Sequence, residues 1–184
     1  MRTLEKRQRL SRRGFLAGSG MTALGTVALS AGATLFDPKG AWALSVTALK
    51  PETMATLIQM ARDIYPHDRL TDAFYAKAVA SYDTDAAKDP KLKALIETGV
   101  AEVDRAARAR GPKRYVDLKA ATDRVAVLHV VEGGALFTKL RAGLVTGLYN
   151  QPEVWAKFGY EGPSAPEGGY LYRGFDDIDW LPAV

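Results

Sequence analysis

Apolar residues recur at helical spacing along most of the chain between residues 51 and 150. The pattern predicts a first helix from Pro51, a residue suited to the first helical position, to Tyr65, because Pro66 stops the run. It predicts a second helix from Asp72, whose side chain can accept hydrogen bonds from the first turn as an N-cap. The pattern therefore predicts two helices that are joined by a short segment containing Pro66.

The most regular stripe follows Asp89-Pro90, a capping residue and then a proline in the first helical turn. The apolar positions are Leu92, Leu95, Ile96, Gly99, Val103 and Ala106. Gly111-Pro112 ends the stripe, since neither residue continues a helix well. A third helix is predicted between these signals.

Helical spacing resumes at Thr122 and continues to Asn150, with a Gly133-Gly134 pair that can kink or split the segment. Pro152 can start one more turn through Trp155. β-branched residues never alternate with other residues over five or more positions, so no strand is predicted. The expected fold is all-α, a small helical bundle over residues 44–157.

The composition changes from Phe158 onward, where glycine, proline and aromatic residues dominate. Such a segment cannot form a regular helix, yet it has too many aromatic residues for a disordered linker. We expect residues 158–184 to be an irregular tail that packs either on the helical domain or on a partner. Candidate partner-binding residues are Trp155, Tyr160, Tyr170, Tyr172, Arg173, Phe175 and Trp180.

The first 43 residues have the layout of an export signal. A basic start is followed by residues 14–36, which carry no charge, and then by Ala41-Trp42-Ala43, a small-x-small cleavage pattern. Arg12-Arg13, with Phe15 and Leu16 behind them, resembles the twin-arginine signal that directs folded proteins to export. We predict a twin-arginine signal peptide cleaved after Ala43. A general secretory signal, a retained membrane anchor and cleavage after Ala33 are the alternatives.

The positive charge of the chain belongs mostly to this leader. The whole chain has 25 Lys and Arg, 21 Asp and Glu, and a net charge of +4. Residues 1–43 hold seven of the cations and two of the anions, so residues 44–184 are left with a net charge of −1. A nucleic-acid-binding role based on overall positive charge is therefore excluded for the processed chain.

The candidates for chemistry within the chain are few. The chain has no Cys, which excludes disulfides, thiol catalysis and covalent attachment of c-type haem. His129 and Glu132, spaced i and i+3 on one helix, could form half of a metal site or a structural hydrogen bond in the apolar stripe. His67 could serve as a general base, but no nucleophile motif accompanies it. No metal site is predicted.

Four short motifs follow one another along the chain, and together they indicate a protein family more specifically than any one of them does alone. They are Tyr65-Pro66-His67-Asp68; Gly147-Leu148-Tyr149-Asn150 with Pro152, Val154 and Trp155; Gly159-Tyr160 with Gly162-Pro163-Ser164; and Gly168-Gly169-Tyr170-Leu171 with Arg173 to Pro182. In this arrangement the chain resembles the small subunit of membrane-bound flavin-dependent dehydrogenases, the gluconate 2-dehydrogenase subunit 3 family.

The resemblance implies a periplasmic complex held at the inner membrane. A large subunit of the glucose-methanol-choline oxidoreductase type would hold FAD and oxidise a sugar, polyol or hydroxy acid, and a cytochrome c subunit with haem c would accept the electrons. This chain would be a non-catalytic accessory subunit without a cofactor, supporting folding of the large subunit and its export through the twin-arginine translocase. The alternatives are a small periplasmic enzyme or metal-binding bundle, and a membrane-tethered binding module.

Overall fold

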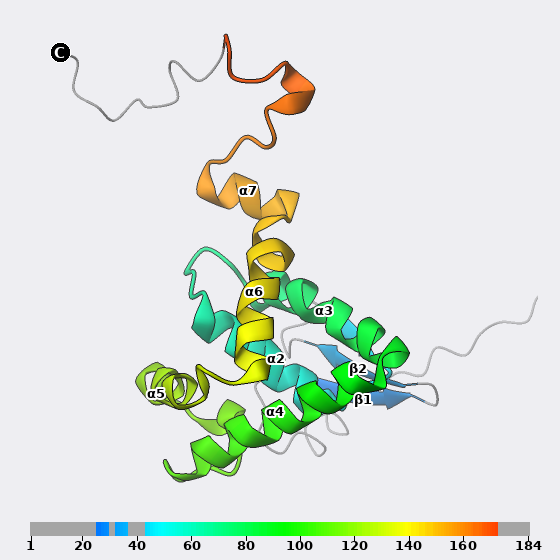
Figure 1. Ribbon diagram of the computed structural model, residues 1–184, viewed down its shortest axis with the longest axis vertical. Coiled ribbons are helices and arrows are strands. Elements are labelled where there is room, and N and C mark those ends of the chain that lie inside the picture. The colour runs from blue at the N-terminus through cyan, green and yellow to red at the C-terminus, as the bar shows by residue number, and fades with distance from the viewer. Residues whose placement is uncertain (1–24, 30–31, 37–42, 173–184) are drawn as a thin grey trace, which may run out of the picture.

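The computed structural model describes residues 25–29, 32–36 and 43–172, and helices dominate this part of the chain. Figure 1 shows the helices packed as a bundle, with the last described residues leading away from it. The α-helices are α2 (Pro51–Ile64), α3 (Asp72–Lys88), α4 (Pro90–Arg108), α5 (Ala121–Val131), α6 (Ala135–Tyr149) and α7 (Pro152–Phe158). Two short 3-10 helices, η1 (Tyr115–Asp117) and η2 (Ala165–Glu167), lie in the connections. The predicted all-α bundle is confirmed.

The sequence signals correctly predict how α2 and α4 begin, but the predicted N-cap of α3 is wrong. Prolines open α2 and α4, and the Asp89 carboxylate caps α4 by accepting from the N–H groups of Lys91 and Leu92 at 2.9 and 3.2 Å. Asp72 is not an N-cap as expected: it is the first residue of α3, where it pairs with Arg62 at 2.9 Å. The acidic side chain still stands at the positive end of the helix dipole.

The glycine pair splits the last long pattern into two helices. Gly133 and Gly134 separate α5 from α6, and α6 then runs through the bundle beside α3 and α4. Close approach requires Gly147, because a Cβ there would lie 2.8 Å from the carbonyl oxygen of Ala78 on α3. Leu136, Leu140, Leu144 and Leu148 form the buried stripe of α6.

Three strands precede the bundle, although the sequence pattern predicted no strand. β1 (Gly25–Leu29), β2 (Gly32–Phe36) and β3 (Ala43–Val46) form an antiparallel sheet in that order. Leu35 on β2 lies opposite Leu44 on β3, and both Leu35 and Val46 are 1% exposed within the core. The short, Gly- and Ala-rich segments lack the length and alternation that would have indicated strands.

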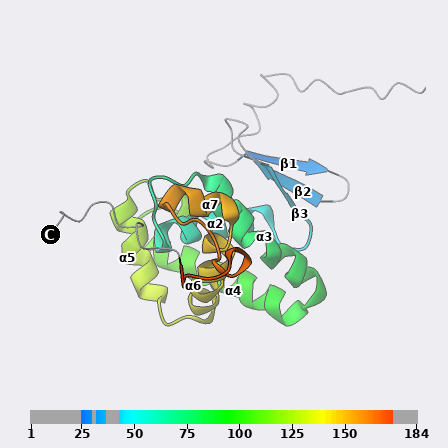
Figure 2. The same ribbon diagram turned by 90° about the horizontal axis from the view of Figure 1, so that it is seen from above.

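The sheet lies at one side of the bundle (Figure 2). β2 contacts α2, and β3 contacts α3. β1 and β2 fall within the predicted signal peptide, and Ala43, the predicted cleavage residue, is the first residue of β3. Arg12, Arg13, Phe15, Leu16 and Ala41 lie outside the described residues. None of the helices in the described part is both long and apolar enough to cross a membrane.

Candidate functional site

The motifs at residues 65–68 and 147–155, which are far apart in the sequence, meet in one aromatic cluster. His67 Nε2 lies 2.6 Å from the hydroxyl of Tyr149, and the two rings meet edge to face. Tyr65 and Phe158 pack on the same group, with Phe158 4.9 Å from the His67 ring. These contacts join the segment after α2 to the ends of α6 and α7.

Trp155 fixes α7 against the end of α6. Its Nε1–H donates to the carbonyl oxygen of Tyr149 at 2.7 Å, and its ring meets that of Tyr160 edge to face. A Cβ on Gly162, which has a φ of +110°, would lie 3.4 Å from the Trp155 ring. Of the predicted partner-binding residues, Trp155 is thus half-buried and held within the chain, and it supports the segment that follows.

That segment, residues 159–172, forms an arm that leads away from the helices (Figure 1). Its aromatic side chains are about half exposed or more: Tyr160 is 48% exposed, Tyr170 52% and Tyr172 86%. Leu171 beside them is 73% exposed. The described part of the tail does not wrap its own helical domain, so these rings are available to another molecule. Arg173, Phe175 and Trp180 lie outside the described residues.

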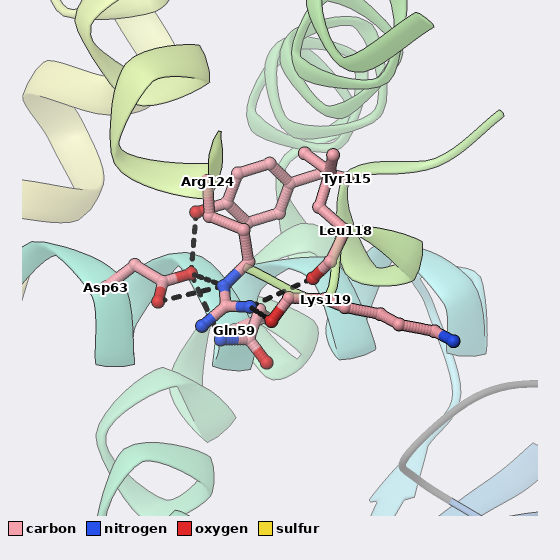
Figure 3. Close-up of polar contacts among 6 residues, drawn as sticks. All are labelled: Gln59, Asp63, Tyr115, Leu118, Lys119 and Arg124. Atoms are coloured by element: carbon pink, nitrogen blue, oxygen red, sulfur yellow. Dashed lines mark hydrogen bonds and ion pairs between the residues drawn. The ribbon is translucent and has the colours of Figure 1, made fainter. Parts of the chain in front are cut away.

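A buried polar network ties α2 to η1 and α5 (Figure 3). The Arg124 guanidinium binds Asp63 at 2.8 Å and also donates to the carbonyl oxygens of Leu118 and Lys119. The Tyr115 hydroxyl donates to Asp63 at 2.7 Å. Burial, together with the charge of Asp63 and this hydrogen bond, raises the pKa of Tyr115 above its ordinary value. The sequence pattern did not indicate this network, since its members lie up to 61 residues apart in the chain.

A second carboxylate, Asp83 on α3, holds the segment that follows β3. Asp83 is 3% exposed and accepts four hydrogen bonds of 2.8 to 2.9 Å. The donors are the backbone N–H groups of Thr47, Ala48 and Leu49 and the hydroxyl of Thr47. Burial alone would raise the pKa of Asp83, but these donors outweigh it and lower the pKa below its ordinary value. We call this arrangement the Asp83 clasp.

His129 and Glu132 lie on the rim of a surface groove rather than in the core. Their side chains are 71% and 57% exposed and 3.3 Å apart, so the expectation that Glu132 belongs to the apolar stripe is wrong. The reason is that the helix ends there, with Glu132 as the C-cap of α5. The described residues contain no group of three His, Asp or Glu side chains placed to hold a metal ion.

The groove itself runs between the end of α2 and the helices α5 and α6. One part has a volume of about 350 Å³, and a second part of about 290 Å³ shares Tyr65, Glu132, Phe137 and Arg141 with it. Apolar and charged side chains both line the groove, among them Leu128, Phe137, His129 and Arg141.

The chain was compared with known proteins at three levels. No family model matches it, no curated protein matches it, and no solved structure matches it.

Proposed function

We propose that this chain is a non-catalytic accessory subunit that supports folding and twin-arginine export of an FAD-dependent dehydrogenase. The observation that carries the proposal is the exposed aromatic arm, and the predicted export leader that precedes the domain supports it. Exposed Tyr and Leu side chains on one short segment are unfavourable in water and typical of protein interfaces. We therefore expect these rings to pack on a protein partner.

The family resemblance gives that partner its chemistry. It is a large subunit of the glucose-methanol-choline oxidoreductase type, which holds FAD and oxidises a sugar, polyol or hydroxy acid. A cytochrome c subunit with haem c completes the complex in the periplasm at the inner membrane. Because the twin-arginine translocase carries folded cargo, the flavoprotein would leave the cytoplasm bound to this chain.

The test is to search the neighbouring reading frames for an FAD-dependent dehydrogenase without an export signal of its own, to co-express it with this chain, and to recover both from the periplasm. We expect the two to co-purify, and we expect the double substitution Arg12→Lys, Arg13→Lys to retain both in the cytoplasm. Normal export of the flavoprotein in a strain that lacks this chain would refute the proposal.

The arm can be tested in the same assay. Tyr170→Ala combined with Tyr172→Ala removes two exposed rings without touching the core, and we expect it to reduce recovery of the flavoprotein at least tenfold. Val130→Ala is the matched control, since Val130 is 74% exposed on α5 and remote from the arm in sequence. Equal recovery with both variants would show that the arm is not the interface.

A further inference from the structure

The arm is small for a protein interface. Its large exposed side chains, with exposed fractions of 48% to 86%, are those of Tyr160, Tyr170, Leu171 and Tyr172. A stable interface usually takes about 20 to 30 residues from each side, which is more than residues 159–172 can supply. A partner that covers the arm must therefore also cover part of the helical domain.

Ring contacts continue from the base of the arm into the helical domain. Phe158, directly before the arm, is 44% exposed, and its ring centroid lies 6.2 Å from that of Tyr149. The ring centroid of Tyr149 in turn lies 5.8 Å from that of Tyr65. Because Tyr65 lines both parts of the groove between α2, α5 and α6, the groove begins where this row of rings ends.

The groove presents exposed apolar surface to a partner. Val125 on α5 is 41% exposed and Val145 on α6 is 53% exposed, and each of them lines one part of the groove. Phe137 lies half-buried in the wall that the two parts share. A partner that covered these side chains would remove apolar surface from water, which favours binding.

Arg141, in the wall that both parts of the groove share, has no partner among the described residues. Its side chain is exposed and makes no hydrogen bond or ion pair within the described part of the chain. The carboxylates that line the groove are engaged elsewhere, since Glu132 contacts His129 at 3.3 Å and Asp63 pairs with Arg124 at 2.8 Å. The guanidinium donors of Arg141 can therefore bind a carboxylate from another chain.

We infer that the groove between α2, α5 and α6 binds a segment of the flavoprotein subunit that carries an acidic side chain next to an apolar one. This inference rests on the proposed function for the identity of the partner. The apolar side chain packs against Phe137 and Val145, and the carboxylate binds the Arg141 guanidinium. A second copy of this chain is a poorer occupant, because groove-to-groove docking would offer Arg141 only Asp63 and Glu132, which already have partners.

Site-specific cross-linking in the purified complex tests which chain lies in the groove. Val145 in the groove, Tyr172 on the arm, or Val130 is replaced by the photoreactive amino acid benzoylphenylalanine. Val130 is the control, since it is 74% exposed and lines neither part of the groove. We expect positions 145 and 172 to link to the flavoprotein and position 130 not to link. Mass spectrometry should place the link from position 145 beside an acidic residue of the flavoprotein.

Substitutions test the charge and the apolar contact separately. Arg141→Glu and Val145→Asp should each weaken binding of the purified flavoprotein at least tenfold in titration calorimetry, because each sets a carboxylate against the partner's acidic or apolar side chain. Arg141→Lys keeps the charge and should weaken binding less than Arg141→Glu. The matched controls Arg108→Glu and Val130→Asp should bind like the unchanged chain, because both residues are exposed and line neither part of the groove.

The outcomes separate this inference from the proposed function. If position 172 links to the flavoprotein but position 145 does not, or if the groove variants and their controls weaken binding equally, the groove assignment is overturned and the accessory function stands. A link from position 145 to a second copy would assign the groove to self-association and also overturn the inference. If no flavoprotein co-purifies or links at any position, the accessory function itself fails, and the inference fails with it.

Discussion

Replacing Asp83 by Asn tests how strongly the start of the helical domain is held. One oxygen of Asp83 accepts from the N–H groups of Ala48 and Leu49, and the other accepts from the N–H and the hydroxyl of Thr47. An amide keeps one of these acceptors and turns an NH₂ group toward the other two donors. Two hydrogen bonds to a charged group are lost, and a buried donor faces another donor.

The expected cost follows from those two bonds. A hydrogen bond to a charged group contributes about 1.5 to 3 kcal/mol, so Asp83→Asn should lower the free energy of unfolding by about 3 kcal/mol or more. Urea unfolding, followed by circular dichroism, should show a midpoint shift of about 1 to 2 M, given a typical slope for a small domain. Asp85→Asn is the matched control, because Asp85 lies two residues away on the exposed side of α3. A loss as small as that of the control would refute the clasp.

The same carboxylate gives the stability a pH dependence. The pKa of Asp83 is lower in the folded chain than its unfolded value of about 3.9, so its contribution is complete above that value. The contribution is lost as the pH falls below about 4 through the folded pKa, because the proton then binds the unfolded chain more readily. Asp83→Asn should remove this part of the acid sensitivity, and an unchanged pH profile of unfolding would contradict the assignment.

Three further substitutions have expected outcomes. Arg124→Met leaves the Asp63 carboxylate buried without its cation and should lower the free energy of unfolding, measured in urea, by about 3 kcal/mol. The double variant Arg124→Met, Asp63→Leu should lose less free energy of unfolding than the sum of the losses of the two single variants. Gly147→Ala places a Cβ against the Ala78 carbonyl and should lower the midpoint of thermal unfolding by several degrees, measured by calorimetry. His129→Ala should leave both stability and metal content, measured by mass spectrometry, unchanged, because its side chain is 71% exposed.

The helices could be predicted because their signals are local. Pro51 and Pro90 begin helices, Asp89 caps α4, and Gly133-Gly134 separates α5 from α6, all within a few residues of the feature that they indicate. Helical spacing also predicted helix over most of residues 122–150, where α5 and α6 lie. Each of these needs only the sequence of one turn or two.

The polar interior could not be predicted, because its partners are distant in sequence. Asp83 meets its donors 34 to 36 residues away, and Asp63 meets Tyr115 52 residues away. The sequence of a helix does not distinguish an acidic residue that is buried from one that is exposed to solvent. Glu132 shows the converse error, since it follows the apolar spacing and yet is exposed at the end of α5.

The two buried carboxylates, Asp63 and Asp83, are both engaged in contacts within the helical domain. Asp83 is occupied by four donors from residues 47–49, and Asp63 by the side chains of Gln59, Tyr115 and Arg124. A carboxylate so engaged cannot take a substrate proton without breaking the contacts that hold the helices together. These two acidic groups therefore act as parts of the support that holds the helices together, and the exposed rings of the arm are a surface that a second protein chain can cover, as the proposed accessory role requires.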